Sequence, residues 1–214
     1  MSADPQDHIV FIVDDDRRIR ESLCALLSTF DLHAVAFGTA AEYIEYAKPD
    51  VPACLLLDVE LPDINRLDLQ SQIAQGNHPP IVFITGHGDI PASVRAIKAG
   101  AIDFLTKPFK EADLMRAIHA AIAQDREARR KRADLAELRQ RFESLTPRER
   151  EVLPLVVSGL LNKQAAATLG ISEITLQIHR RNIMKKMGAP SLADLVRMAA
   201  ALEIPIAHSR HAER

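Results

Sequence analysis

The stretch LLLDVELP, residues 55–62, decides the fold. It is an apolar run too short for a helix core, and it ends in the carboxylate of Asp58 before a proline closes it. Such a run predicts a β-strand buried on both faces, with an acid at its C-terminal end. The carboxyl ends of strands are where parallel α/β sheets bind ligands. The alternative is that Asp58 caps a loop, and residues elsewhere in the chain decide between the two.

Further apolar runs alternate with segments of helical periodicity. Strands are expected over residues 8–13, 33–36, 53–58, 80–84 and 102–105, and helices over 17–30, 39–46, 67–73, 90–99 and 112–122. Strands that alternate with helices in this way predict an α/β domain with a doubly wound parallel sheet of five strands.

Polar side chains follow four of these strands. Asp14 and Asp15 follow the first, Asp58 ends the third, Thr85 follows the fourth and Lys107 follows the fifth. In the flavodoxin-like strand order 2-1-3-4-5, these ends converge on one crevice.

Clustered carboxylates raise each other's pKa unless a cation is bound, and oxygen-only ligands suit Mg²⁺ (or Mn²⁺). A carboxylate can then act as nucleophile toward a phosphoryl group, giving an aspartyl-phosphate. The Lys107 ammonium and the Thr85 hydroxyl are suited to hold the phosphoryl oxygens. These groups are therefore suited together to the transfer of a phosphoryl group to one of the carboxylates.

Charge divides the chain into two halves. Residues 1–125 carry 19 acidic and 10 basic side chains, whereas residues 126–214 carry 10 acidic and 17 basic ones. The basic half is expected to face a polyanion. Cys24 and Cys54 lie in apolar contexts and predict a reducing compartment. With neither a signal peptide nor an apolar run long enough for a membrane span, we expect a cytoplasmic protein without membrane contact.

A long helical linker is expected over residues 124–143, after the first domain, residues 1–123. Acid-first pairs such as Asp125–Arg129 and Glu137–Arg141 support the helix, and an apolar 3-4-3 repeat follows at Leu135, Leu138, Phe142 and Leu145. The repeat fits either a short coiled-coil seam between protomers or packing on the second domain. The basic run 129–132 either contacts DNA phosphate or is solvated.

Four helices are expected in the last domain, residues 144–214. Helices are expected to start at Thr146 and Ser172 and to stop at Gly159, Gly170 and Gly188. This places a tight turn between the second and third helices, which makes a helix-turn-helix. The third helix buries Leu176, Ile183 and Met187 and directs Gln177, Arg180, Arg181, Lys185 and Lys186 mostly outward. A basic outer face on this helix fits entry into the DNA major groove.

The first domain resembles the receiver domain of bacterial two-component response regulators. The resemblance rests on Asp14-Asp15, Asp58, Thr85 and Lys107-Pro108, and the phrases ITGHGDIP and AIKAGAIDFLTKPF look similar to the FixJ branch. It implies phosphorylation of Asp58 by a histidine kinase and a cis Lys107-Pro108 bond. It also implies Mg²⁺ held by Asp14 or Asp15, Asp58 and the backbone carbonyl of Glu60.

The same resemblance assigns two further roles and shows one departure. Phe104 matches the switch aromatic, although a permanently buried core ring is the alternative. Glu60 and His87 match variable positions that tune the lifetime of the phosphoryl group, or are ordinary loop residues. Arg66, after Asn65, stands where the family has glycine, so we expect altered phosphorylation kinetics.

Residues 145–200 resemble the LuxR/FixJ/NarL-type DNA-binding domain, through LTPREREVL and KQAAATLGISEITLQIHRRNIMKKM. By position, the resemblance implies base contacts from Gln177, Ile178 and Arg181, and backbone contacts from Lys163, Thr175, His179, Arg180 and Lys185. The family often has Lys at 177 and Arg at 174, where this chain has Gln and Ile. We expect weaker binding or a changed site preference.

Together these patterns predict a two-domain transcriptional regulator that binds promoter DNA when Asp58 is phosphorylated. The expected partners are a sensor histidine kinase, a second copy of the chain on phosphorylation, and RNA polymerase. The alternative is a phosphorylation-independent regulator whose receiver docks other proteins. A turnover phosphatase does not fit, because Glu60 only approximates the required Asp-x-Asp pattern and no substrate cap is evident. At most, slow autodephosphorylation is expected.

Overall fold

The computed structural model describes residues 7–59, 61, 78–86 and 102–205. It divides into two compact units, Met1–Arg129 and Arg130–Arg214, hereafter unit 1 and unit 2. The expected helices over residues 67–73 and 90–99 lie outside the described residues, as do Glu60, Asn65, Arg66 and His87.

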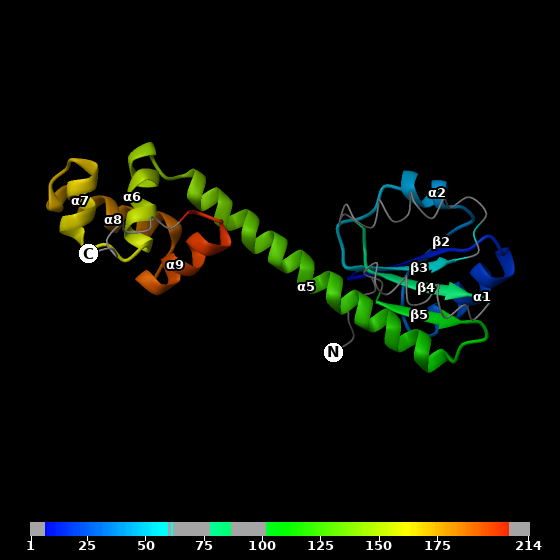
Figure 1. Ribbon diagram of the computed structural model, residues 1–214. Helices are drawn as coiled ribbons and strands as arrows, with labels where there is room; N and C mark the ends of the chain where they lie inside the picture. The colour runs from blue at the N-terminus through cyan, green and yellow to red at the C-terminus, as the bar shows by residue number, and fades with distance from the viewer. Residues whose placement is uncertain (1–6, 60, 62–77, 87–101, 206–214) are drawn as a thin grey trace. The chain divides into compact units, whose positions relative to one another are not determined.

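Unit 1 is built on a parallel five-stranded sheet (Figure 1). The strands lie in the order β2-β1-β3-β4-β5, as predicted, and each neighbouring pair is parallel. Their bounds are β1 Ile9–Val13, β2 Ala34–Phe37, β3 Ala53–Asp58, β4 Ile81–Thr85 and β5 Asp103–Thr106. All residues of β1, β3 and β4 are buried, because both faces of this sheet are covered.

Alternate residues of the strands enter two separate cores. On one face, Val10, Cys54 and Val82 pack with α1 (Arg17–Ser28) and the first turns of α5 (Glu111–Glu143). On the other face, Phe11 and Leu55 pack with Phe37 and with Tyr43 of α2 (Ala40–Glu45). Each of the two N-terminal helices begins at a side-chain cap, Asp16 for α1 and Thr39 for α2.

Asp125 of α5 fixes the beginning of β3. Its buried carboxylate accepts a hydrogen bond from the backbone N–H of Ala53 at 2.9 Å. The pairing of β3 with β4 starts only at Leu55, so β4 does not reach this N–H group and the side chain satisfies it instead. Arg129 donates to Asp125 at 2.7 Å, as the predicted pair requires, and also bonds Asp50.

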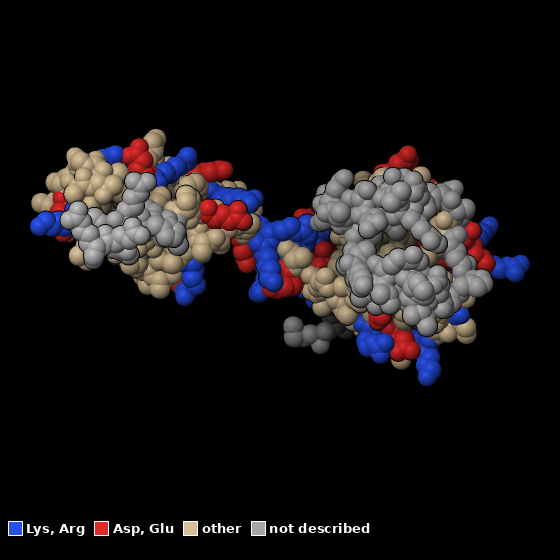
Figure 2. Space-filling model, in the orientation of Figure 1, with Lys and Arg blue, Asp and Glu red and all other residues tan. Residues whose placement is uncertain are grey.

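Beyond this contact, residues 126–134 of α5 are almost all exposed. Figure 2 shows Lys and Arg atoms gathered along the middle of this helix. Nearer its C-terminal end, Leu138 and Phe142 pack against the core of unit 2, and Leu145 belongs to that core. The apolar repeat of the linker therefore packs on the second domain, which was one of the two alternatives left open by the sequence.

Unit 2 contains four helices after α5: α6 Pro147–Val157, α7 Asn162–Leu169, α8 Glu173–Met187 and α9 Leu192–Ala201. The turn between α7 and α8 passes through Gly170 in the left-handed region, with φ of 64°. Leu176, Ile183 and Met187 of α8 are fully buried, as predicted. The α7–turn–α8 arrangement is a helix-turn-helix.

Arg141, from the last turn of α5, binds the C-terminal end of α8. Its guanidinium donates to the backbone oxygen of Met187 at 3.2 Å and pairs with Glu137 at 2.6 Å. Gly188 follows with φ of 69°, and a Cβ built there would lie 2.6 Å from the Arg141 guanidinium. The backbone angle therefore favours glycine at this helix end, and a larger residue would also require the flexible end of Arg141 to move.

Candidate functional site

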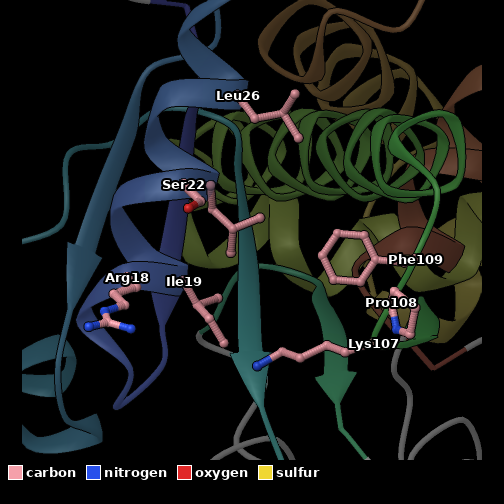
Figure 3. A pocket seen from close by; sticks show the side chains of 8 residues that line it. Arg18, Ile19, Ser22, Leu26, Lys107, Pro108 and Phe109 are labelled. Carbon is pink, nitrogen blue, oxygen red and sulfur yellow. The ribbon is translucent and has the colours of Figure 1, made fainter.

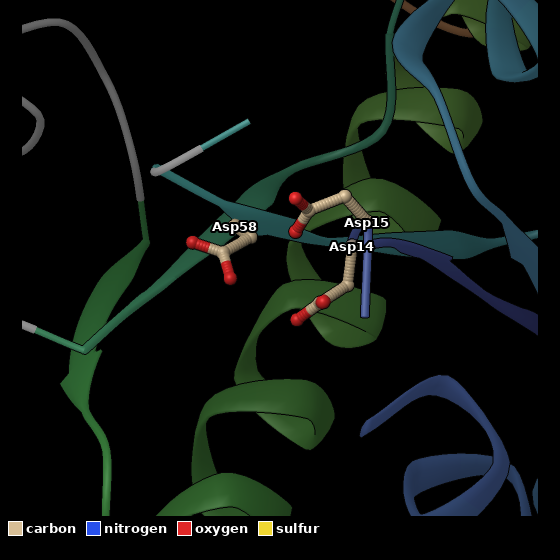
Figure 4. A group of neighbouring side chains, drawn as sticks. All are labelled: Asp14, Asp15 and Asp58. Carbon is tan, nitrogen blue, oxygen red and sulfur yellow. The ribbon is translucent and has the colours of Figure 1, made fainter. Parts of the chain in front are cut away.

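Three carboxylates gather at the C-terminal edge of the sheet (Figure 4). Asp14 and Asp15 follow β1 and Asp58 ends β3, and one oxygen from each lies within 4.8 Å of the others. Asp14 is 2% exposed and Asp58 5% exposed, whereas Asp15 is open to solvent. The strand order brings these residues together, because β1 and β3 are neighbours in the sheet.

Lys107 bridges the two buried carboxylates. Its Nζ lies 2.9 Å from Asp14 Oδ2 and 2.6 Å from Asp58 Oδ2. Lys107 follows β5, and its peptide bond to Pro108 is cis. Its backbone N–H donates to the backbone oxygen of Thr85 at 2.7 Å. The sequence-predicted acceptor, acidic partners and lysine therefore lie in one site.

Among the described residues of this site, acidic side chains outnumber basic ones. Burial raises the pKa of Asp14, and the hydrogen bonds from Lys107 and the Asp16 N–H only partly oppose this. Burial alone would lower the pKa of Lys107, but its bonds to Asp58 and Asp14 outweigh burial and raise it. One ammonium faces three carboxylates, so a divalent cation would complete the charge balance. The oxygen-only donor set fits Mg²⁺.

The loop that carries the acids is held by two groups that sequence reasoning did not assign to it. Asp16 does not join the acidic cluster: its side chain accepts from the Arg18 N–H at 2.8 Å, and its own N–H donates to Asp14 Oδ1 at 2.9 Å. Arg20 donates to the backbone oxygens of Asp14 and Asp15 at 2.6 and 3.0 Å. The sequence showed only that Arg20 is a basic residue one turn inside the first helix, which does not predict its bonds to this loop.

Thr85 and Phe104 lie on the neighbouring strands. Thr85 ends β4 and is 4% exposed, and it pairs in register with Thr106 of β5. Phe104 is half-buried and packs against the aromatic core on one face of the sheet. The ring is therefore not fully buried as the alternative for it required, and its switching role stays a prediction.

A largely apolar pocket of about 390 Å³ borders the site (Figure 3). Arg18, Ile19 and Ser22 of α1 line one side of it, and Lys107, Pro108 and Phe109 line the other. The side chain that holds Asp14 and Asp58 therefore also forms part of a surface hollow beside α1.

The predicted DNA contacts lie on α7 and α8 of unit 2. Lys163, Gln177, Ile178, Arg181 and Lys185 are exposed. The other three are half-buried: Thr175 and His179 lie on α8, and Arg180 donates to Asn162 of α7 at 3.1 Å. The structure thus presents five of the eight residues on the surface of the helix-turn-helix and uses Arg180 to join its helices.

The prediction that Lys186 points outward is wrong. Its Nζ lies 2.7 Å from Oε2 of Glu149, a carboxylate that is only 3% exposed. The same oxygen accepts from the Thr146 N–H at 2.8 Å. Burial favours neutral Glu149, but the bonds from Lys186 and Thr146 outweigh it and lower the pKa of this carboxyl. The lysine therefore compensates a buried charge, which periodicity alone does not reveal.

Comparison with known proteins defines the class. A family model of the response regulator receiver domain matches residues 10–119, and a model of the luxR family of bacterial regulatory proteins matches residues 143–199. The chain belongs to the response regulators of two-component systems, of the FixJ/NarL type.

Individual relatives match along nearly the whole chain. "Nodulation protein W" of Bradyrhizobium diazoefficiens is 50% identical over 206 residues, covering 96% of this chain and 91% of the relative. "Response regulator protein TmoT" of Ectopseudomonas mendocina is 44% identical, with 92% and 90% covered. "Transcriptional regulatory protein FixJ" of Azorhizobium caulinodans is 40% identical, with 91% and 93% covered.

Solved structures agree with this assignment. A low-resolution structure of the response regulator StyR is 45% identical with a TM-score of 0.78, and the match covers 91% of this chain and 98% of that one. Full-length FixJ from B. japonicum is 35% identical with a TM-score of 0.52, covering 92% and 98%.

Among the described residues, no helix is both long and apolar enough to cross a membrane.

Proposed function

We propose that Asp58 accepts a phosphoryl group from a sensor histidine kinase and that this modification controls DNA binding by α7 and α8. One observation carries the proposal: Lys107 joins Asp58 to Asp14 at the edge of the sheet, in a site where the described residues supply three carboxylates and one ammonium. A carboxylate excess of this kind is typical of a site that binds a cation and a substrate rather than of a structural ion pair.

In the reaction, a carboxylate oxygen of Asp58 forms a bond to phosphorus while the bond from phosphorus to the donor's leaving group breaks. Lys107 keeps its proton and holds phosphoryl oxygens electrostatically, and the Thr85 hydroxyl donates to another. Asp14, Asp15 and Asp58, with the Glu60 carbonyl, would hold Mg²⁺. When bound, Mg²⁺ neutralises charge on the phosphoryl oxygens.

We expect no turnover chemistry beyond slow loss of the phosphoryl group. The product acts instead through unit 2, whose luxR-family match and transcriptional relatives support promoter DNA as the ligand. Paired half-sites would need two copies of the chain, so we expect a homodimer after phosphorylation. RNA polymerase is the expected downstream partner.

The test is to incubate the full chain with acetyl phosphate and Mg²⁺ and to measure intact mass and binding to promoter DNA. Wild type should gain one phosphoryl group and bind DNA more tightly. Asp58→Asn should do neither. Asp16→Asn is the matched control: it removes an adjacent acid, yet asparagine still caps α1, so the variant should behave as wild type.

The second candidate, a receiver that acts only as a docking module, is favoured by Arg66 in place of the expected glycine and by Gln177 and Ile174, where the family resemblance leads us to expect cations. It predicts DNA binding that is the same with and without phosphodonor, and the same in Asp58→Asn. That outcome would reject the main proposal.

A further inference from the structure

The outer face of α8 forms one continuous exposed stripe. Ile174, Gln177, Ile178 and Arg181 are spaced by three, one and three residues, which places them on the same side of a helix. All four are exposed, and Lys185 continues the stripe one turn further. We call these four residues the α8 stripe.

Two members of the α8 stripe are large apolar side chains that touch no core. Ile174 is 72% exposed and Ile178 is 55% exposed, whereas Leu176, Ile183 and Met187 on the opposite face are buried. Isoleucine is also a weaker helix former than Leu, Arg or Lys, so local helix stability does not explain two of them here. Their position requires an explanation from outside the fold.

The surroundings of this apolar pair indicate what covers it. Exposed cations lie on the same two helices of the helix-turn-helix, namely Lys163 of α7 and Arg181 and Lys185 of α8. A purely apolar protein surface offers no anions to pair with these cations, whereas duplex DNA presents both anionic phosphates and apolar groups. The apolar group on the major-groove edge of DNA is the C5 methyl of thymine.

We infer that Ile174 is a specificity-determining residue which, with Ile178, contacts thymine methyl groups in the major groove. Ile174 is the second residue of α8, and it is the N-terminal residues of the second helix in a helix-turn-helix that reach base edges. Side chains four residues apart on a helix lie about 6 Å apart, so the two methyl groups fall within about two base pairs of each other. Gln177 lies between them and favours adenine, so this part of each half-site is A·T-rich.

The inference rests on the proposed DNA-binding function, and the experiment separates the two. Full-length chain, with and without acetyl phosphate and Mg²⁺, selects duplexes from a randomised pool. Each thymine of the selected duplex is then replaced singly by uracil, which lacks only the methyl group. Wild type should lose about fourfold in affinity, the cost of one buried methyl, at the thymine that Ile178 contacts and likewise at the thymine that Ile174 contacts.

Ile174→Ala should bind the thymine duplex about fourfold more weakly and show no further loss with uracil at that position. Ile174→Arg should also lose the response to uracil, while the slope of log affinity against log salt steepens by about one phosphate contact. Leu161→Ala is the matched control, because Leu161 is 69% exposed but is the N-cap residue just before α7, outside the stripe. It should keep the wild-type response to uracil.

Selection of no sequence by wild type would reject the proposed function itself. Selection of a defined site with equal affinity for every uracil duplex would reject only the thymine inference. A full uracil penalty retained in Ile174→Ala would reject it as well. Loss of transcription in Ile174→Ala with unchanged DNA binding would assign the residue to a protein contact instead.

Discussion

Each unit of the chain contains a buried carboxylate bonded to a lysine, and the two arrangements differ in their balance. In unit 2, Lys186 forms an ion pair with Oε2 of Glu149, and the Thr146 N–H donates to that oxygen as well. In unit 1, Lys107 is divided between Asp14 and Asp58, with Asp15 nearby. The first arrangement is neutral, whereas among the described residues the second has three carboxylates and one ammonium.

The two arrangements shift carboxyl pKa values in opposite directions. The pKa of Glu149 is lowered, so the folded state favours its charge, whereas the pKa of Asp14 is raised, so the folded state resists it. A protein tolerates such resistance where function requires it. The comparison therefore separates a structural ion pair from a reactive site by charge balance, although both use an acid and a lysine.

Mg²⁺ should produce the largest difference between the units. At a hundredfold excess over its dissociation constant, a ligand of the folded state stabilises it by about 2.7 kcal/mol. Unit 1 should gain this and unit 2 should not. Denaturant unfolding followed by tyrosine fluorescence reports unit 1 selectively, because Tyr43 and Tyr46 are the only tyrosines and the chain has no Trp. Hydrogen exchange of peptides from α6–α9 reports unit 2.

Asp58→Asn is the control for this effect, since it removes one oxygen ligand and should abolish most of the gain. An equal gain in the variant, or slower exchange in α6–α9 with Mg²⁺, would contradict the assignment of the cation to the acidic cluster.

Glu149→Gln should lower the stability of unit 2 by about 2 kcal/mol, because it leaves Lys186 without its charged partner and weakens the cap of α6. Hydrogen exchange in α6 and α8 measures the change. Glu151→Gln provides the control: Glu151 pairs with Arg148 on the surface, and its loss should cost under about 0.5 kcal/mol. Similar costs for both variants would show that the buried pair has no special weight.

Asp14→Asn should change stability in the opposite direction. With divalent cations removed by a chelator, it should stabilise unit 1 by about 1 kcal/mol, because the neutral amide avoids the cost of burying the Asp14 charge. Tyrosine fluorescence during denaturant unfolding tests this. Asp31→Asn is a suitable control, because Asp31 is exposed with φ of 56°, a conformation that asparagine also adopts. A destabilised Asp14→Asn variant would mean that Lys107 already balances the site.

The pH dependence of these two effects should be the smallest signal. The folded pKa of Glu149 lies below its ordinary value of 4.5, so its stabilising contribution is complete above about pH 4.5 and is lost as the pH falls through the folded pKa. The folded pKa of Asp14 lies above its ordinary value of 3.8, so its cost is present above the folded pKa and vanishes as the pH falls to about 3.8. Unfolding from about pH 7 to about pH 3.5 should therefore show both variants converging on wild type from opposite sides.

Local sequence patterns predicted the elements of both units to within a few residues. β3 was predicted at the bounds it has, and α7 ends just before Gly170, the glycine expected to stop it, because a continuous apolar run and a glycine stop are signals contained within one segment. The strand order was expected from the flavodoxin-like doubly wound pattern, and it places Asp14, Asp58 and Lys107 at one edge of the sheet.

The pairings between segments were harder to foresee. Lys186 was expected on the DNA-facing side because periodicity gives a side chain's direction but not its partner 37 residues away. Asp125 was seen only as a partner of Arg129, although its main role is to bind Ala53 on β3. In both cases the deciding contact is tertiary, and no spacing within a single helix encodes it.

The contact between Arg141 and the end of α8 has a consequence for exchanging output domains among response regulators. Leu138, Arg141 and Phe142 lie in α5, before the point where the luxR family match begins at residue 143, yet they pack against or bond the recognition module. A chimera joined at residue 143 would transplant α8 without the arginine at its C-terminal end and with part of its apolar cover missing. A junction within the exposed residues 126–134 keeps these groups, so the smallest portable module begins inside the connecting helix.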